Sequence, residues 1–251
     1  MQFQSAPIPL TNPPRVVFDP LRVGHHPFLA VSFAMKLLPA MKTDHKMKKQ
    51  FLTLLALATL FTSCTDHDVS TTRYHLDDTS VAEWKGYLKT GYFNEGSIGV
   101  ESNSLVIEEG KVKSGSFTIP VSSIINFNLP TEEVKHQLVH HLQSPDFFNM
   151  ALHPNVTFEI TAVTPFSGSG DGAVTGANYQ VAGHLTMLGK SNPVTFPARI
   201  ELSGDSFKME GKVVIDRTLW GMTYATEPGL PDYASIKPGI DVHLKLSGAK
   251  N

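Results

Sequence analysis

The sequence predicts a single antiparallel β domain, folded as a barrel or a sandwich, in the part of the chain that follows residue 73. Three observations support this fold class. Apolar and polar residues alternate with a period of two, turn signals separate the alternating segments, and no βαβ pattern intervenes. The 251-residue chain is 41% hydrophobic, which is ordinary for a protein with a buried core.

Six segments show the alternation most clearly. They are residues 82–89, 116–121, 156–161, 179–187, 195–202 and 240–246. In the first of them, for example, Trp84 lies between Glu83 and Lys85. Each segment therefore has one apolar and one polar face, which is typical of an antiparallel sheet that meets water on one side.

Turn-forming residues stand between these segments, at positions 108–111, 167–172, 189–193 and 203–206. Such a succession of hairpins favours a closed barrel or a sandwich.

One helix interrupts the β pattern. Thr131 is a candidate N-cap because its hydroxyl can accept a hydrogen bond from the first turn. Val134, Leu138 and Leu142 follow at a spacing of four residues. We expect a helix that ends at about His141 and turns this apolar stripe toward the domain.

The N-terminal part of the chain has the pattern of an export signal. Met47 is followed by two lysines, then by the apolar run 51–63 and by Cys64, the only cysteine. Residues 61–64, Phe-Thr-Ser-Cys, resemble the lipobox of bacterial lipoproteins, in which lipid is attached to the cysteine. The alternative is that Cys64 is a buried structural thiol.

We therefore expect a signal peptide at residues 47–63, a polar tether at 64–72 and a barrel domain at 73–251. Residues 1–46 hold seven of the 17 prolines and show no periodicity. They are interpreted as the product of a misassigned start codon or as a disordered extension. The expected location is the cell envelope, with Cys64 anchored to a bacterial membrane and the domain facing the periplasm or the surface.

The charge changes when the leader is removed. The whole chain has a net charge of −2, whereas the residues from Cys64 onward carry 14 Lys and Arg against 21 Asp and Glu. An acidic domain without a cluster of basic residues argues against nucleic acid as a partner.

The segment after the expected helix is the most specific part of the sequence. Residues 141–150, His-Leu-Gln-Ser-Pro-Asp-Phe-Phe-Asn-Met, and residues 153–158, His-Pro-Asn-Val-Thr-Phe, resemble the signature of the YceI-like polyisoprenoid-binding family. Residues 181–190, 194–196 and 215–221 resemble further motifs of that family, in the same order. The resemblance covers roughly residues 74–246. It departs from the family at residues 91–96, where many relatives carry a histidine, so no role of that histidine is transferred to this chain.

The resemblance implies an eight-stranded antiparallel, lipocalin-like β-barrel with a short helix packed against it. It also implies that the lumen holds a long lipid chain, such as an isoprenoid quinone, a polyprenyl lipid or a fatty acid. The implied role is binding, sequestration or transport of that lipid in the envelope, without catalysis and without a cofactor.

The apolar faces of the strands would then form the wall of a cavity. The candidates are Trp84, Phe117, Ile119, Phe158, Leu185, Met187, Phe196, Phe207, Met209 and Val242. Each of these residues could instead fill a solid core. Burial of one five-carbon unit contributes roughly 4 kcal/mol at about 0.8 kcal/mol per CH₂, so a few units suffice for binding.

Two other functions stay open from the sequence alone. His136 and His140 have a helical spacing that can bind zinc, and together with His184 they could serve a metal-dependent or lipid-modifying hydrolase. No His-Glu-x-x-His or Gly-x-Ser-x-Gly motif accompanies them, and Asp216 and Arg217 are interpreted as a barrel corner. The other alternative is a structural lipoprotein with a solid core. A homodimer is also left open.

Overall fold

The computed structural model of the chain describes residues 71–170 and 172–251. The expectations for residues 1–46, for the signal peptide at 47–63 and for Cys64 lie outside the described residues, as does the expected tether up to residue 70.

Twelve β-strands, one α-helix and two short 3-10 helices make up the described part of the chain. The strands are β1 (Thr71–Leu76), β2 (Val81–Leu88), β3 (Phe93–Gly99), β4 (Leu105–Glu108), β5 (Lys111–Ser114), β6 (Ser116–Pro120), β7 (Ile125–Asn126), β8 (Asn155–Pro165), β9 (Tyr179–Met187), β10 (Lys190–Ser203), β11 (Ser206–Asp216) and β12 (Ile236–Lys250). The helices are η1 (Val121–Ser123), α2 (Glu132–Gln143) and η2 (Arg217–Trp220).

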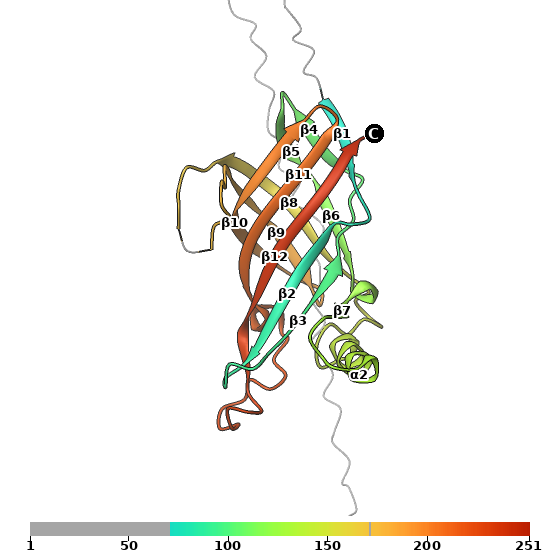
Figure 1. Cartoon of the computed structure of the whole chain (residues 1–251), viewed down its shortest axis with the longest axis vertical. Helices are drawn as coiled ribbons and strands as arrows, with labels where there is room; N and C mark the ends of the chain where they lie inside the picture. The colour runs from blue at the N-terminus through green and yellow to red at the C-terminus, as the bar shows by residue number, and fades with distance from the viewer. Residues whose placement is uncertain (1–70, 171) are drawn as a thin grey trace, which may run out of the picture. The chain divides into compact units, whose positions relative to one another are not determined.

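The strands pair antiparallel and occupy eight positions around a barrel (Figure 1). β1 and β2 lie end to end along β12, because β1 pairs with residues 248–250 and β2 with residues 236–245. β3 and β4 fill the next position, since β3 pairs with β2 and β4 with β1. β5 and β6 fill the third, between β4 and β8. The strands from β8 to β12 are continuous, and each pairs with the next.

The barrel closes where β6 meets the segment between β3 and β4. The N–H of Glu101 donates to the carbonyl of Thr118 at 2.8 Å, and the N–H of Thr118 donates to the carbonyl of Glu101 at 2.9 Å. The predicted fold class, an antiparallel barrel with a short helix, is therefore confirmed. The strands number twelve rather than eight because turns divide three of the eight positions and β7 adds a short segment beside β3.

Two hairpin turns need glycine at their second position. Leu188 and Gly189 join β9 to β10 with φ angles of 50° and 72°, and Glu109 and Gly110 join β4 to β5 with the same two values. Two consecutive positive φ angles give a type I′ turn, whose twist matches that of the flanking strands, and glycine adopts such an angle without steric cost.

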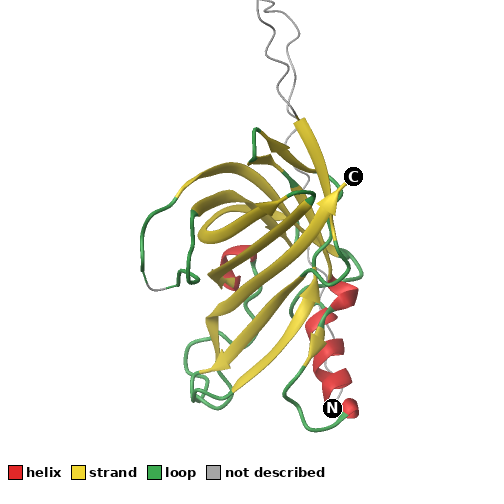
Figure 2. Cartoon of the chain, turned by 45° about the horizontal axis from the view of Figure 1, so that its top comes forward, coloured by secondary structure: helices red, strands yellow, loops and turns green. Residues whose placement is uncertain are grey.

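The helix α2 begins as the sequence predicts. The Thr131 hydroxyl accepts a hydrogen bond from the N–H of Val134 at 3.3 Å, and the helix ends at Gln143, two residues beyond the expected end. Figure 2 shows α2 lying alongside one end of the barrel. Within residues 71–170 and 172–251, no helix has the length and apolar character needed to span a bilayer.

The inward-facing side chains fill the two ends of the barrel differently. Leu105 and Phe207 are almost completely buried at the end formed by β1, β4 and β5 (Figure 1), where they belong to the main hydrophobic core. Trp220 and Val121 belong to a second buried cluster, which includes the corner at η2. The space between the walls is therefore packed solid at the end formed by β1, β4 and β5 and leaves a hollow elsewhere, which is described next.

Candidate functional site

The barrel encloses a cavity of about 260 Å³. Strands β2, β3, β6 and β8–β12 form its wall, and Leu138 and Leu142 of α2 cover one side. A cavity of about 150 Å³ with a comparable apolar lining holds benzene, so this one has room for more than six carbon atoms. A barrel with a solid core, one of the alternatives left open by the sequence, does not fit this observation.

The lining of the cavity is almost entirely apolar. The side chains on it that carry nitrogen or oxygen atoms are those of Trp84, Tyr87, Tyr92, Asn94 and Arg217. An apolar ligand would bind to such a lining mainly because its burial removes apolar surface from water. The few polar atoms of the lining would orient that ligand.

The structure places nine of the ten predicted wall residues around this cavity. They are Trp84, Phe117, Ile119, Phe158, Leu185, Met187, Phe196, Met209 and Val242. The period-two pattern found them because one face of each strand points inward. That they contact a ligand stays a prediction.

Phe207 is the exception, because it lies outside the lining of the cavity. It faces inward close to the β10–β11 hairpin, opposite Leu202 on one side and Gly248 on the other. Only 1% of its surface is exposed, since other core side chains surround it. Alternation alone indicates which face points inward, but it does not indicate how far along the barrel the hollow extends.

Three phenylalanine rings form one wall of the cavity. The rings of Phe117 and Phe158 lie 6.3 Å apart between centroids, and those of Phe158 and Phe196 lie 6.1 Å apart, each pair tilted. Glycines on the neighbouring strands make room for these rings, because a Cβ at Gly183 would lie 2.3 Å from Phe158 and one at Gly211 would lie 3.0 Å from Phe196. This part of the wall is therefore aromatic, with the rings packed closely over the two glycines.

The cavity reaches the surface near the hairpin that joins β2 to β3. Tyr92 of this hairpin lines the cavity, yet 54% of its surface is exposed. Figure 1 shows this hairpin at the same end of the barrel as α2 and the loop after η2. A ligand longer than the cavity would leave the barrel at this end.

Arg217 fixes the loop that follows η2. Its guanidinium donates to the carbonyls of Met222 at 2.7 Å and Tyr224 at 2.8 Å, with longer bonds of 3.5 Å to the carbonyls of Ile236 and Lys237. Only 1% of Arg217 is exposed, and this burial lowers its pKa from the ordinary value. The residue is thus held by backbone carbonyls, in agreement with the interpretation of a barrel corner.

An aromatic cluster joins the end of α2 to the same loop. Nε2 of His141 lies 3.0 Å from Oδ2 of Asp146, and the His141 ring packs edge-on against Phe147 and Tyr224, with centroids 5.0 and 4.8 Å apart. The Phe147 ring in turn lies 5.8 Å from the guanidinium carbon of Arg217. These residues of the signature segment therefore tie the helix, the loop and the corner together over one end of the cavity.

Sequence reasoning did not assign several lining residues to the site. Leu138, Leu142, Phe147 and Phe148 lie on the cavity from α2 and from the segment after it. The helical stripe indicated that the first two face the domain, but it could not show that they cover a hollow. Asn94 could not be identified as a site residue from the sequence, because a single polar residue on an apolar strand face has many explanations.

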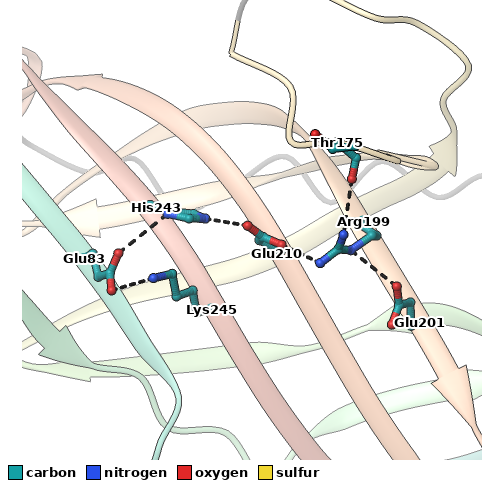
Figure 3. Close-up of polar contacts among 7 residues, drawn as sticks. All are labelled: Glu83, Thr175, Arg199, Glu201, Glu210, His243 and Lys245. Atoms are coloured by element: carbon teal, nitrogen blue, oxygen red, sulfur yellow. Dashed lines mark hydrogen bonds and ion pairs between the residues drawn. The ribbon is translucent and has the colours of Figure 1, made fainter.

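The outer face of the barrel carries a row of charged residues across four strands (Figure 3). His243 lies between two carboxylates, with Nε2 2.8 Å from Glu210 and Nδ1 3.6 Å from Glu83. Arg199 lies 2.6 Å from Glu210, and Lys245 lies 2.7 Å from Glu83. Because these contacts link neighbouring strands on the outside of the wall, we interpret them as structural.

The three histidines considered for a metal site are spread over the surface. His136 and His140 are exposed on α2, and His184 is exposed on the outer face of β9. In the part of the chain that the structure describes, no group of three or more His, Cys, Asp or Glu residues is arranged to hold a metal ion.

The sequence of the chain is similar to those of known proteins. A family model described as the YceI-like domain matches residues 74–247. The protein called Protein YceI from Escherichia coli O157:H7 is 30% identical over an alignment of 114 residues that covers 39% of this chain and 55% of the relative. The same values apply to Protein YceI of Shigella boydii serotype 4. The chain thus spans about half the length of the curated relatives it matches.

The chain also resembles solved structures. BcnA of Burkholderia cenocepacia has a TM-score of 0.50 at 20% identity, over 68% of this chain and 98% of BcnA, which shows a shared fold. A polyisoprenoid binding domain from Saccharophagus degradans has a TM-score of 0.48 at 14% identity, over 72% of this chain and 99% of that domain.

Proposed function

Because the chain belongs to the YceI-like domain family, we propose that its barrel binds the chain of an isoprenoid or other long-chain lipid. The observation that carries the proposal is the apolar cavity of about 260 Å³, open at one end beside Tyr92. A slender hydrocarbon chain fits such a space, whereas a compact polar substrate would lose its hydration without gaining hydrogen bonds.

The size of the cavity limits how much of the lipid is buried. By comparison with the cavity that holds benzene, about ten carbons fit, which is two isoprene units. At about 0.8 kcal/mol per CH₂, their burial contributes roughly 8 kcal/mol before the cost of association, so a ten-carbon ligand should bind with a Kd weaker than about 1 µM. A longer chain would extend past the opening.

We further propose that the protein sequesters or carries this lipid in the bacterial cell envelope. The apolar run before Cys64 and the lipobox-like residues 61–64 support an exported chain with a lipid anchor. The candidate ligands remain those that the family resemblance implies: an isoprenoid quinone, a polyprenyl lipid or a fatty acid.

The direct test is to identify what copurifies with the protein. The full chain, isolated from bacterial envelopes, is analysed by native mass spectrometry and by solvent extraction. We expect one bound lipid with a chain of ten or more carbons. A barrel that carries no lipid and shows no affinity for prenyl chains would overturn the proposal.

Two neighbouring valines of β11 provide a matched pair of variants. Val213 lines the cavity, whereas Val214 points outward and is 66% exposed. The ring in Val213→Phe would occupy part of the cavity, so we expect prenyl-chain affinity to fall at least tenfold. Val214→Phe makes the same chemical change on the outer wall and should leave the affinity within twofold of wild type. Equal affinities of the two variants would contradict a ligand inside the barrel.

A further inference from the structure

Two buried polar atoms lie on the cavity wall without a partner in the protein. Within the described ranges, Nε1 of Trp84 and Oδ1 of Asn94 are the buried side-chain nitrogen and oxygen atoms that accept or donate no hydrogen bond. Both residues line the cavity. Since buried polar atoms in native proteins nearly always have partners, this pair calls for an explanation.

The register of the sheet brings the two side chains together. Trp84 on β2 lies opposite Gly96, and Asn94 on β3 lies opposite Gly86. Trp84 and Asn94 are therefore diagonal neighbours on the inner face of adjacent strands, a spacing that long and aromatic side chains bridge.

The absence of a side chain at Gly96 makes room for the indole ring of Trp84. A Cβ at this position would be 2.7 Å from Cζ2 of Trp84, so the ring lies across the glycine. Cζ2 is bonded to the ring carbon that carries Nε1, and this edge of the indole consequently points toward β3. The indole nitrogen thus lies near the strand that carries the Asn94 acceptor.

The pair is situated near the opening of the cavity. Tyr92 at the opening lies in the hairpin, two residues before Asn94, and Ile98 lies on the lining farther along β3. The lining that surrounds the pair on the other strands, such as Val242 and Leu244, is apolar. A lipid that enters with its chain in the hollow would therefore place its polar end at this pair.

The chemistry of the pair selects one kind of polar group. A hydroxyl accepts a hydrogen bond through its oxygen and donates one through its hydrogen, so it satisfies both atoms at once. An ether or a ketone oxygen accepts from Trp84 but leaves the Asn94 oxygen unpaired. An ionised carboxylate or phosphate would place negative charge against that same oxygen.

We propose that Trp84 and Asn94 bind the hydroxyl group of a lipid alcohol, so that the barrel prefers an alcohol over a chain-matched molecule that only accepts hydrogen bonds. This inference rests on the proposed function, since it assumes that a lipid chain occupies the cavity. It adds the chemical class of the end group and the residues that recognise it.

The test compares three ligands with the same ten-carbon branched skeleton: geraniol, geranyl methyl ether and the corresponding hydrocarbon. Their affinities for the full chain are measured by calorimetry. We expect geraniol to bind the wild type about tenfold more tightly than the ether, because the ether leaves a buried acceptor unpaired. Asn94→Leu, which removes the acceptor that only the alcohol satisfies, should reduce this preference to less than threefold. Trp84→Phe removes a donor that both geraniol and the ether use, so it should weaken these two ligands alike while the hydrocarbon still binds.

A control variant and a folding check accompany the two substitutions. Glu83→Gln changes a neighbour of Trp84 on the outer face and should leave the preference for geraniol unchanged. Melting temperatures identify a variant that has lost its fold, and the two substitutions on separate strands give independent readings.

The outcomes separate this inference from the proposed function. If geraniol, the ether and the hydrocarbon bind equally well, the hydroxyl site is overturned while the lipid cavity stands. A preference for geraniol over the ether that survives in Asn94→Leu overturns it too, because the hydroxyl must then be recognised elsewhere. Failure of the wild type to bind any of the three ligands overturns both proposals.

Discussion

Arg217 is a cation in surroundings that are unusual for one, because its side chain is almost completely buried. A cation is almost never fully buried without a carboxylate partner, yet the hydrogen-bond acceptors of Arg217 are carbonyl groups of the loop after η2 and of the first two residues of β12. The guanidinium carbon also lies 5.8 Å from the centre of the Phe147 ring. Its role is therefore to shape the cover of the cavity, because one side chain fixes several carbonyls that would otherwise be buried without a donor.

Replacement of Arg217 by methionine should cost several kcal/mol of unfolding free energy. The substitution keeps much of the volume but leaves buried carbonyls unpaired, at about 1–3 kcal/mol each. We expect a loss of about 3–5 kcal/mol in urea denaturation. Arg199→Met, at a half-exposed arginine on the outer wall, should cost less than about 1 kcal/mol. Equal losses would show that Arg217 has no special structural role.

Glu210 gives a prediction on pH. Its pKa lies below the usual value, chiefly because of the hydrogen bond with His243, with a further contribution from the charge of Arg199, while burial opposes both. A depressed carboxyl pKa adds stability above the pKa of the unfolded state, about 4.3, and this contribution is lost as the pH falls through the folded-state pKa.

Glu210→Gln should therefore lower the unfolding free energy by up to about 1 kcal/mol at pH 7. The difference from wild type should shrink toward zero below about pH 4. Denaturation curves from pH 3 to pH 7 provide the measurement, with Glu201→Gln at a more exposed carboxylate as the control. A difference that is independent of pH would contradict this assignment.

At the scale of elements, the strand interruptions and α2 determine the shape of the hollow. The breaks in three strand positions allow β1, β4 and β5 to fold over one end of the barrel, where Leu105 and Val112 fill the interior. At the other end α2 lies across the wall, so that Leu138 and Leu142 replace strand residues as lining. The barrel is thereby closed by its own core at one end, whereas at the other end the helix covers one side of the cavity and the opening beside Tyr92 remains.

Thr131→Ala should weaken the start of α2. The variant removes the hydroxyl that accepts from the N–H of Val134, and loss of such a cap costs about 1 kcal/mol. Thermal unfolding followed by circular dichroism should show a lower midpoint, whereas Thr131→Ser, which keeps the hydroxyl, should stay close to wild type. A serine variant as unstable as the alanine variant would show that the threonine methyl group, not the cap, is responsible.

At the scale of the whole molecule, a lipid cavity and a lipid anchor would serve the same membrane. We expect Cys64→Ser to move the protein from the membrane to the soluble fraction, or to block removal of the leader, because acyl chains on the cysteine would hold it to the bilayer. Cell fractionation and immunoblotting measure this change. Thr65→Ser, beside the cysteine, is the control and should stay in the membrane fraction. An unchanged distribution of Cys64→Ser would refute lipidation.

Much of the barrel could be predicted from the sequence, because the alternation of apolar and polar residues in a strand is visible in consecutive residues. The alternation around Trp84 and Phe158 identified the inward face, and Thr131 identified the start of the helix. Turn residues such as Gly189 identified the hairpins. These signals depend on neighbours within a few positions in the chain, where the period of two or the spacing of four is fixed by backbone geometry.

Only the tertiary structure decided where the barrel is hollow and what lines the hollow. Phe207 and Met209 both face inward on β11, but just Met209 borders the cavity, since the depth of packing depends on strands that are distant in sequence. The unpaired atoms of Trp84 and Asn94 likewise exist only because β2 and β3 pair in one register across Gly96. The sequence by itself determined the periodicity and so the inward face of each strand. The volume left between those faces, and the polar atoms that meet there, result from packing among all eight positions, which no local pattern encodes.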